Sequence, residues 1–241
     1  MTRTILVTGG GTGIGRAIAA RFAAAGDTVV ITGRRLEPLQ VTAKELGDSV
    51  VAQRCDHTDP EQLEALLDRL PDRIDVLVNN AGGNTDLDTA APDSLAAFAQ
   101  TWRTNLDANL LSAALTTQAV ADRLAPGGAI VHIGSIAADQ GAGAYGAAKA
   151  GLASWNISLA RELGPRDITT NVVSSGYVQE TEFFRDSMTD ERRARLIGNT
   201  AVKRPGTVSD IAETVAFLAS PGARHITAQT LNVNGGAFAS R

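Results

Sequence analysis

Short runs rich in β-branched residues alternate with segments of helical periodicity along almost the whole chain. Strands of this kind are buried on both faces, and their alternation with helices predicts a parallel sheet covered on both sides. The runs lie at Thr4–Thr8, Thr28–Thr32, Ile74–Asn80, Ala129–Ser135, Ile168–Val173 and Gln229–Val233, with a weaker candidate at Ser49–Gln53. The sequence therefore predicts an α/β fold with a doubly wound parallel sheet flanked by helices on both faces.

Length and patterning favour a single domain. The chain has 241 residues and 44% hydrophobic content, enough to bury a full core. It contains no repeat, low-complexity tract or Ser/Gly/Pro-rich linker, and the strand and helix patterns continue to the C-terminus. We expect residues 1–241 to form one domain.

Charge and cysteine usage exclude several classes of function. A net charge of -4 argues against a nucleic-acid or membrane-surface binder and leaves a small-molecule partner. The first apolar run is too short for a signal peptide and no later run could span a bilayer, so we expect a cytoplasmic protein. Cys55 alone allows no internal disulfide, and the three histidines form no zinc-type pattern, so no metal site is expected.

Polar and glycine residues follow five of the predicted strands, in the segments TGGG, TGRR, NNAGG, GS and SSG. In a doubly wound sheet, ligands bind beyond the carboxyl ends of the strands, near the point where strand order reverses. We therefore expect these five strand ends to converge on one site.

The first strand runs directly into TGGGTGIG, Thr8–Gly15, and then into a helical pattern. Such a turn exposes backbone N–H groups at a helix N-terminus, which favours an anion, and its context in a Rossmann-type unit predicts binding of a dinucleotide pyrophosphate. The strict G-x-G-x-x-G spacing is absent, and a plain strand-to-helix turn is the alternative. The turn residues expected at the cofactor are Gly9, Gly11, Thr12, Gly13, Ile14 and Gly15.

The end of the second strand indicates which dinucleotide binds. An NAD-binding unit carries a carboxylate here for the ribose 2′-hydroxyl, but this chain has Gly33 followed by Arg34 and Arg35. Two guanidinium groups suit a 2′-phosphate, so NADP(H) is favoured and NAD(H) stays possible. The alternative is that both arginines belong to a surface turn. Asp56 and the neighbouring His57 end the third strand and are candidates for the adenine end, although Asp56 could equally cap the next helix.

The segment AYGAAK brings a phenol and an ammonium together. Tyr145 and Lys149 are four residues apart, so on a helix they share one face. A free tyrosine titrates near a pKa of about 10, too high for efficient proton exchange at neutral pH. The neighbouring ammonium, with the positive nicotinamide of an oxidised cofactor close by, is expected to lower that pKa. The alternative is an exposed pair on an alanine-rich helix.

Ser135 ends the fourth of the stronger strand runs. A hydrolase nucleophile would need the elbow G-x-S-x-G, which is missing because Ile133 and Ala137 occupy the glycine positions. The remaining interpretations are a loop or cap hydroxyl, or a hydroxyl that acts together with Tyr145.

Five motifs occur in one order along the chain: TGGGTGIG, NNAG, TNL, GS and YGAAK. With this set the sequence resembles the classical short-chain dehydrogenases/reductases, and its tail is similar to that of the 3-oxoacyl-[acyl-carrier-protein] reductase group. The resemblance implies that Tyr145 donates a proton to a carbonyl oxygen positioned by Ser135 while hydride arrives from the nicotinamide. It further implies that Lys149 holds the nicotinamide ribose and that Asn105 supports a water chain.

The resemblance also implies contacts to the cofactor from NNAG and from the loop after the sixth strand. One departure is Ser175, which stands where the family usually has proline and could loosen that loop. The stretch 180–199 mixes aromatic and charged residues and predicts either a lid over the substrate or an ordinary surface helix pair. The implied contact residues are Asn79, Ala81, Gly82, Gly176, Val178 and Thr181.

The expected activity is NADP(H)-dependent reduction of a ketone or of a carrier-bound 3-oxoacyl thioester, or the reverse oxidation. Alternatives are an NAD(H)-dependent sugar, polyol or other secondary alcohol dehydrogenase, and a cofactor-binding regulator without turnover. The family resemblance further implies a homo-oligomer, a tetramer or a dimer, built on helices that include the one with Tyr145.

Overall fold

The computed structural model describes residues 2–88, 91–184 and 188–239. Its centre is a seven-stranded sheet in which every pairing is parallel and the strand order is β3-β2-β1-β4-β5-β6-β7. The strands are β1 (Thr4–Thr8), β2 (Thr28–Gly33), β3 (Val50–Arg54), β4 (Ile74–Asn79), β5 (Leu124–Ser135), β6 (Thr169–Ser175) and β7 (Thr230–Val233). The doubly wound parallel sheet predicted from the sequence is confirmed.

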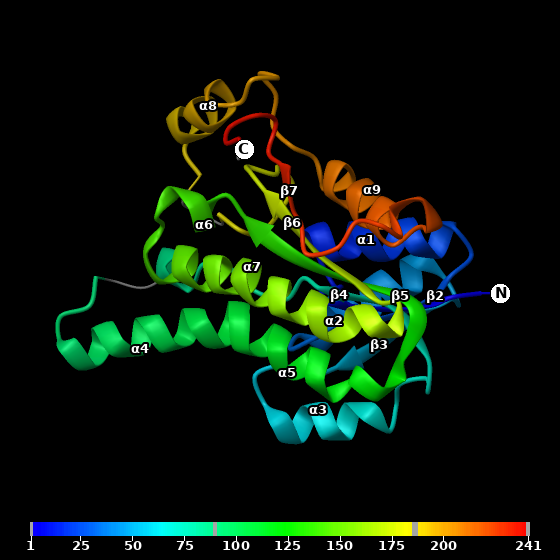
Figure 1. Ribbon diagram of the computed structural model, residues 1–241. Helices are drawn as coiled ribbons and strands as arrows, with labels where there is room; N and C mark the ends of the chain where they lie inside the picture. Colours follow the sequence, from blue (N-terminus) through cyan, green and yellow to red (C-terminus); the bar gives the residue numbers. More distant parts are fainter. Residues whose placement is uncertain (1, 89–90, 185–187, 240–241) are drawn as a thin grey trace.

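Helices cover both faces of the sheet (Figure 1). The helices are α1 (Gly13–Ala24), α2 (Leu36–Leu46), α3 (Pro60–Leu67), α4 (Leu95–Leu106), α5 (Ser112–Ala119), α6 (Ala137–Gln140), α7 (Gly143–Leu163), α8 (Asp190–Gly198) and α9 (Val208–Leu218). One core cluster joins the sheet to α1, α2 and α9, and a second joins it to α3, α5 and α7.

Alternation along the strands explains why two cores form. In β5, Val131 and Ile133 belong to the cluster with α1 and α9, whereas Ile130 belongs to the cluster with α7. Successive side chains of a strand point to opposite faces, so a strand that is apolar throughout must be covered on both sides. Strand order reverses between β1 and β4. In doubly wound sheets the ligand crevice lies at such a point, beyond the carboxyl ends of the strands.

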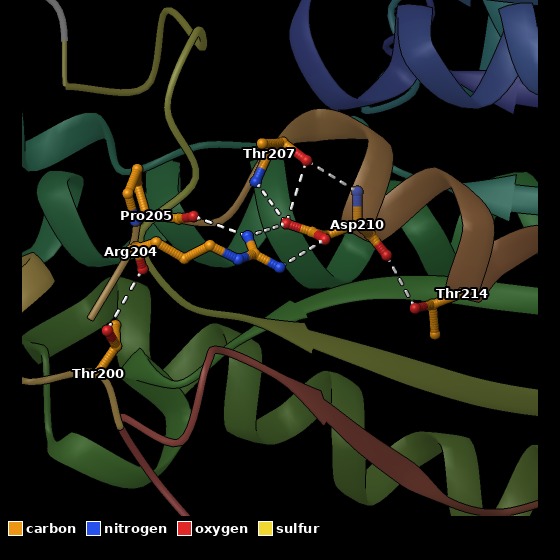
Figure 2. A network of polar contacts seen from close by, with 6 residues as sticks. All are labelled: Thr200, Arg204, Pro205, Thr207, Asp210 and Thr214. Atoms are coloured by element: carbon orange, nitrogen blue, oxygen red, sulfur yellow. Dashed lines mark hydrogen bonds and ion pairs between the residues drawn. The ribbon is translucent and has the colours of Figure 1, made fainter. Parts of the chain in front are cut away.

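The N-terminus of α9 is held by a network of polar side chains (Figure 2). Thr207 and Asp210 form a capping box, because each side chain accepts a hydrogen bond from the other residue's backbone N–H. Arg204 binds both carboxylate oxygens of Asp210, at 2.7 and 3.1 Å. These contacts anchor the neighbouring Gly206, which forms a backbone bridge with Val178 in the loop after β6. The cap of α9 therefore supports a loop at the carboxyl edge of the sheet.

Candidate functional site

Ser135, Tyr145 and Lys149 meet at the carboxyl end of β5. Ser135 is the last residue of that strand, and the other two lie in the first turns of α7 with only 5% of each residue exposed. Lys149 donates from Nζ to the carbonyl oxygen of Ile133 at 2.9 Å, and its Nζ lies 5.8 Å from the centre of the Tyr145 ring. A hydrogen bond from the Ser135 side chain reaches the Tyr145 phenol. The structure therefore brings the two hydroxyls and the ammonium together.

Burial is the main influence on the pKa values of Tyr145 and Lys149. Burial raises the pKa of Tyr145 to about 12, and the hydrogen bond from Ser135 offsets only part of this effect. Burial also lowers the pKa of Lys149 to about 8, because an ammonium removed from water loses its hydration. In the chain itself, desolvation of the phenol dominates the pKa of Tyr145. The lowering expected from Lys149 together with the positive ring of an oxidised nicotinamide stays a prediction.

Asn105 lies buried near the end of α4, where the helix changes to a π-helical stretch, η2 (Asp107–Leu111). Its amide donates to Asp86 at 2.6 Å and to the backbone of Thr101 at 3.2 Å, and its backbone carbonyl accepts from Asn109 at 3.0 Å. π-turns within helices are frequent at functional sites. The water chain implied for Asn105 stays a prediction.

A pocket of about 200 Å³ opens beside Ser135 and Lys149, between α7 and the strands β5 to β7. Its walls also include Ala153 of α7, Ser174 of β6 and Asn232 of β7. Ser135 and Lys149 thus line this pocket between α7 and the sheet, and they also lie at the carboxyl end of β5.

The glycine turn between β1 and α1 packs against the end of β4. Gly9 has φ +66°, and a Cβ added there would lie 2.8 Å from the Asn80 amide nitrogen. A Cβ on Gly15 would lie 2.1 Å from the carbonyl oxygen of Gly9. These two positions require glycine, because any side chain would push the first turn of α1 away from the turn before it.

Asn80 is a supporting residue that the sequence analysis missed. Its amide donates to the carbonyls of Thr8 and Gly9 at 2.9 and 3.1 Å, and the Thr8 hydroxyl accepts from the backbone of Asn80 and Ala81. These bonds tie the glycine turn to NNAG. The doubled asparagine was the available signal, but only coordinates show which of the two faces the turn.

The first turn of α1 suits an anion. Thr12 is the N-cap, yet its side chain makes no capping hydrogen bond, and the first turn has no acidic residue. The backbone N–H groups of this turn are therefore suited to a phosphate. The neighbouring Gly11 packs against the start of α2, its carbonyl accepts from Thr42, and Ile14 lies against the core.

Arg34 and Arg35 are exposed after β2, with Arg35 as the N-cap residue of α2. Arg35 forms an ion pair with Glu182, N to O 2.6 Å, from the loop after β6. The charge of Arg34 and two hydrogen bonds from Thr58 stabilise the ionised carboxylate of Asp56. Burial alone would raise the pKa of Asp56, but these bonds and this charge lower it. Asp56 is thus engaged in a local turn after β3, and its expected contact with the adenine stays a prediction.

His57 and Asn79 have their side chains in the interior. His57 contacts the hydroxyls of Thr32 and Thr116, each at 2.7 Å, and burial lowers its pKa to about 4. The Asn79 amide donates to Thr117 at 3.0 Å and contacts His132 at 3.2 Å. Because these side chains face the core, only the backbone of His57 and Asn79 remains for a cofactor contact.

The loop after β6 lies across the glycine turn. Gly176 approaches the backbone of Asn234 so closely that a Cβ would lie 3.0 Å from its Cα, and Val178 bridges to Gly206. The side chain of Thr181 lies beside Gly13, about 3.6 Å from where a Cβ would be. Ser175, in place of proline, donates to the carbonyl of Gly134 at 3.2 Å.

On the other side, Ala81 and Gly82 begin the loop after β4. Gly82 has φ +148°, and a Cβ there would lie 2.5 Å from the Asn109 side-chain oxygen. The backbone of this loop thus passes between the glycine turn and η2, at the reversal point of the sheet.

Part of the predicted lid 180–199 covers Tyr145. The ring of Phe183 lies 5.6 Å from that of Tyr145, and Phe184 packs edge-on against Phe183 at 4.9 Å. Helix α8 follows, capped by Thr189 and without a buried residue. Residues 185–187 lie outside the described residues, and only one helix of the expected pair is found in the part that is described. The lid remains a proposal.

A family model described as enoyl-(acyl carrier protein) reductase matches residues 9–237 of the chain. The 3-oxoacyl-[acyl-carrier-protein] reductase FabG of Escherichia coli (strain K12) is 38% identical over 242 residues, which covers 97% of this chain and 96% of that protein. The chain belongs to the short-chain dehydrogenase/reductase family. The resemblance inferred from its motifs is thereby confirmed.

Solved structures of the family have the same fold. A short-chain dehydrogenase from Burkholderia cenocepacia J2315 in complex with NADP is 34% identical, covers 98% of each chain and has a TM-score of 0.85. A protein from Brucella melitensis titled short-chain dehydrogenase/reductase SDR:glucose/ribitol dehydrogenase is 31% identical, covers 99% of this chain and 97% of that one, and also has a TM-score of 0.85.

This short-chain dehydrogenase/reductase is an enzyme of the oxidoreductase class, and its family uses a nicotinamide cofactor. A search of the described residues finds no helix with the length and apolar content needed to cross a membrane.

Proposed function

We propose that this short-chain dehydrogenase/reductase uses NADP(H) to reduce a ketone or a 3-oxoacyl thioester to the alcohol. The observation that carries the proposal is the hydroxyl pair of Ser135 and Tyr145 beside the buried Lys149, at the same carboxyl edge of the sheet as the glycine turn. Substrates of this kind present a carbonyl oxygen that two hydroxyl groups can bind at once.

Each side chain has a distinct part in the proposed reaction. When bound, the nicotinamide supplies the hydride that becomes attached to the carbonyl carbon. Tyr145 donates its proton to the carbonyl oxygen, and Ser135 holds that oxygen by a hydrogen bond. Phe183 covers Tyr145 and limits the access of water. The proton from the phenol and the hydride together complete the alcohol.

The raised pKa of Tyr145 has two consequences: the phenol stays protonated, as reduction requires, but it is also a weaker proton donor. A phenol with a pKa of about 12 is protonated at neutral pH and can donate a hydrogen bond to a carbonyl. Oxidation of an alcohol needs the phenolate as the base, and burial opposes that form. We therefore expect reduction to run at neutral pH and oxidation to need more alkaline solution.

The preference for NADP(H) is supported by Arg34 and Arg35 and by the lack of a carboxylate after β2. Replacing both arginines with glutamine should raise the KM for NADPH far more than that for NADH. Each charge-assisted phosphate contact contributes about 1.5–3 kcal/mol, so loss of a single one should weaken binding by roughly 10- to 150-fold. Steady-state kinetics with both cofactors measures the ratio, and an unchanged ratio would reject this assignment.

The substrate proposal draws on the FabG of Escherichia coli, whose name states a 3-oxoacyl carrier substrate. The test is to follow NADPH and NADH absorbance with a panel of 3-oxoacyl thioesters, cyclic ketones and sugars. Rapid NADPH oxidation with thioesters or ketones supports the proposal. Turnover of sugars or polyols with the NAD(H) pair would select the alternative dehydrogenase, and tight NADPH binding without turnover of any carbonyl would indicate a regulator.

Self-association, as a tetramer or a dimer, is a further part of the proposal. Apolar side chains are exposed along α4, with Leu95 87% and Phe98 49% exposed, and Ile157 on α7 is 44% exposed. A helix face of this kind is suited to burial in an interface. Light scattering after size-exclusion chromatography measures the mass of the assembly.

A further inference from the structure

Glu182 and Arg35 meet across the crevice although they are 147 positions apart in the sequence. Arg35 follows β2 and begins α2, whereas Glu182 lies on the loop after β6. The Arg35 guanidinium donates to the Glu182 carboxylate at 2.6 Å, and both side chains are largely exposed. The segment that follows β2 has no carboxylate at its start, and Glu182 from the loop after β6 brings one to this place.

The backbone before Glu182 explains how it reaches Arg35. Val178 and Gln179 are fixed to Gly206 by a backbone bridge and a 2.9 Å hydrogen bond. Glu180 adopts a positive φ of 62°, which turns the chain, and the side chain of Thr181 then lies beside Gly13 of the glycine turn. The loop is therefore directed over the glycine turn towards the start of α2.

The contact bears on cofactor choice, and this step rests on the proposed function, in which Arg35 binds a 2′-phosphate. Glu182 occupies a donor of the same guanidinium and has the same sign of charge as a phosphate. We propose that Glu182 is a specificity-determining residue that competes with the 2′-phosphate for Arg35 and so limits the preference for NADPH over NADH.

The neighbouring Phe183 requires a test variant that changes only the side chain of Glu182. It is the residue after Glu182 and contacts the Tyr145 ring, so a deletion or a change of backbone would disturb the site as well. Glu182→Gln keeps the size of the side chain and removes only the charge. Glu180→Gln is the matched control, because Glu180 is also exposed and its change removes an equal charge two residues away.

The experiment measures dissociation constants of NADPH and NADH by isothermal titration calorimetry for the wild type, for both single variants and for Arg35→Gln with and without Glu182→Gln. An exposed ion pair contributes at most about 1 kcal/mol, so Glu182→Gln should tighten NADPH binding by about 2- to 5-fold and leave NADH unchanged. The control should have a smaller effect, and Glu182→Gln should have no more than the effect of the control when Arg35 is already glutamine. Added salt should reduce the difference.

The outcomes separate the two proposals. If the wild type prefers NADPH and Arg35→Gln abolishes the preference, but Glu182→Gln leaves it unchanged or weakens NADPH binding, the competition by Glu182 is wrong and the proposed function stands. If the wild type shows no preference and Arg35→Gln changes neither dissociation constant, the NADP(H) assignment fails and the role of Glu182 fails with it.

Discussion

Lys149 in the candidate site and Asp210 at the start of α9 are both charged side chains, but the fold treats them differently. Burial lowers the pKa of Lys149 to about 8 and so moves the residue towards its neutral form. The pKa of Asp210 is lowered to about 2 by hydrogen bonds from Arg204 and Thr207, which keep it ionised. The surroundings stabilise the charge at the cap and oppose the charge in the site.

The difference indicates which region serves structure and which serves chemistry. The contacts of Asp210 close a helix end and anchor a loop, so its charge lowers the free energy of the folded state. Tyr145, Lys149 and His57 have pKa values shifted by burial towards their neutral forms. Tyr145 and Lys149 lie together at the strand end, and neighbouring titratable groups with such shifted pKa values are typical of a catalytic site, whereas the side chain of His57 faces the core. Substitutions in the site should therefore reduce turnover without reducing stability, whereas substitutions at the cap of α9 should reduce stability without reducing turnover.

The sharpest contrast comes from Tyr145→Phe. The ring and its contact with Phe183 remain while the proton donor is lost, so turnover should fall by about 10²- to 10⁴-fold and stability should not decrease. NADPH binding, measured by calorimetry, should be retained. Turnover at the wild-type rate in this variant would contradict the role assigned to Tyr145.

The second largest expected effect is a loss of stability in acid, caused by the buried His57. Its pKa is about 4 in the folded protein and near 6.5 when exposed, so the unfolded state binds more protons between these values. The contribution of His57 to the free energy of unfolding, about 3 kcal/mol, is therefore complete above about pH 6.5 and is lost as the pH falls towards 4. His57→Gln should flatten this slope in urea unfolding, although the buried His132 still contributes. His225→Gln, at an exposed position, is the control for the substitution itself.

Much of the fold was predictable from the sequence because most of its strands are short runs rich in β-branched residues, and several of them end in or are followed by glycine or asparagine. Six of the seven strands begin and end within two residues of the prediction. β5 is the exception, since it starts at Leu124 and not at Ala129. The segment LAPGG joins the strand through an irregular pairing with β4. Turn-forming residues there gave no local signal for a strand.

The candidate site was predictable only in part. Motif spacing placed Ser135, Tyr145 and Lys149 together, and the structure brings them together. Spacing could not give the sign of the pKa shift of Tyr145, because that sign depends on how much of the ring the folded chain covers. The ion pair between Arg35 and Glu182 was equally hidden, since it depends on the path of a loop that is distant in sequence.

Lys149→Met tests whether the fold opposes the buried charge. The pKa of Lys149 is about 8 when folded and 10.5 ordinarily, so the penalty for its charge is absent above pH 10.5 and complete below about pH 8. At about 1.4 kcal/mol per pKa unit, and allowing about 1 kcal/mol for the lost bond to Ile133, the variant should be about 2 kcal/mol more stable at neutral pH. Turnover should nevertheless fall by roughly 10²-fold. A variant less stable than the wild type by urea unfolding would show that the ammonium is well stabilised.

Asp210→Asn should have the smallest effect, and unlike the site variants it should reduce stability and leave turnover unchanged. It removes the ion pair with Arg204 and the charge of the carboxylate in the capping box, so the free energy of unfolding should fall by about 1 kcal/mol at neutral pH. The difference from the wild type should shrink as the pH falls from 3.8 towards 2, because the wild-type carboxylate is then protonated as well. Turnover should be unchanged, since the backbone bridge between Gly206 and Val178 does not need the charge. A loss of turnover comparable to that of Tyr145→Phe, at unchanged stability, would mean that the cap of α9 belongs to the chemistry of the site, because the loop it anchors would then control the crevice.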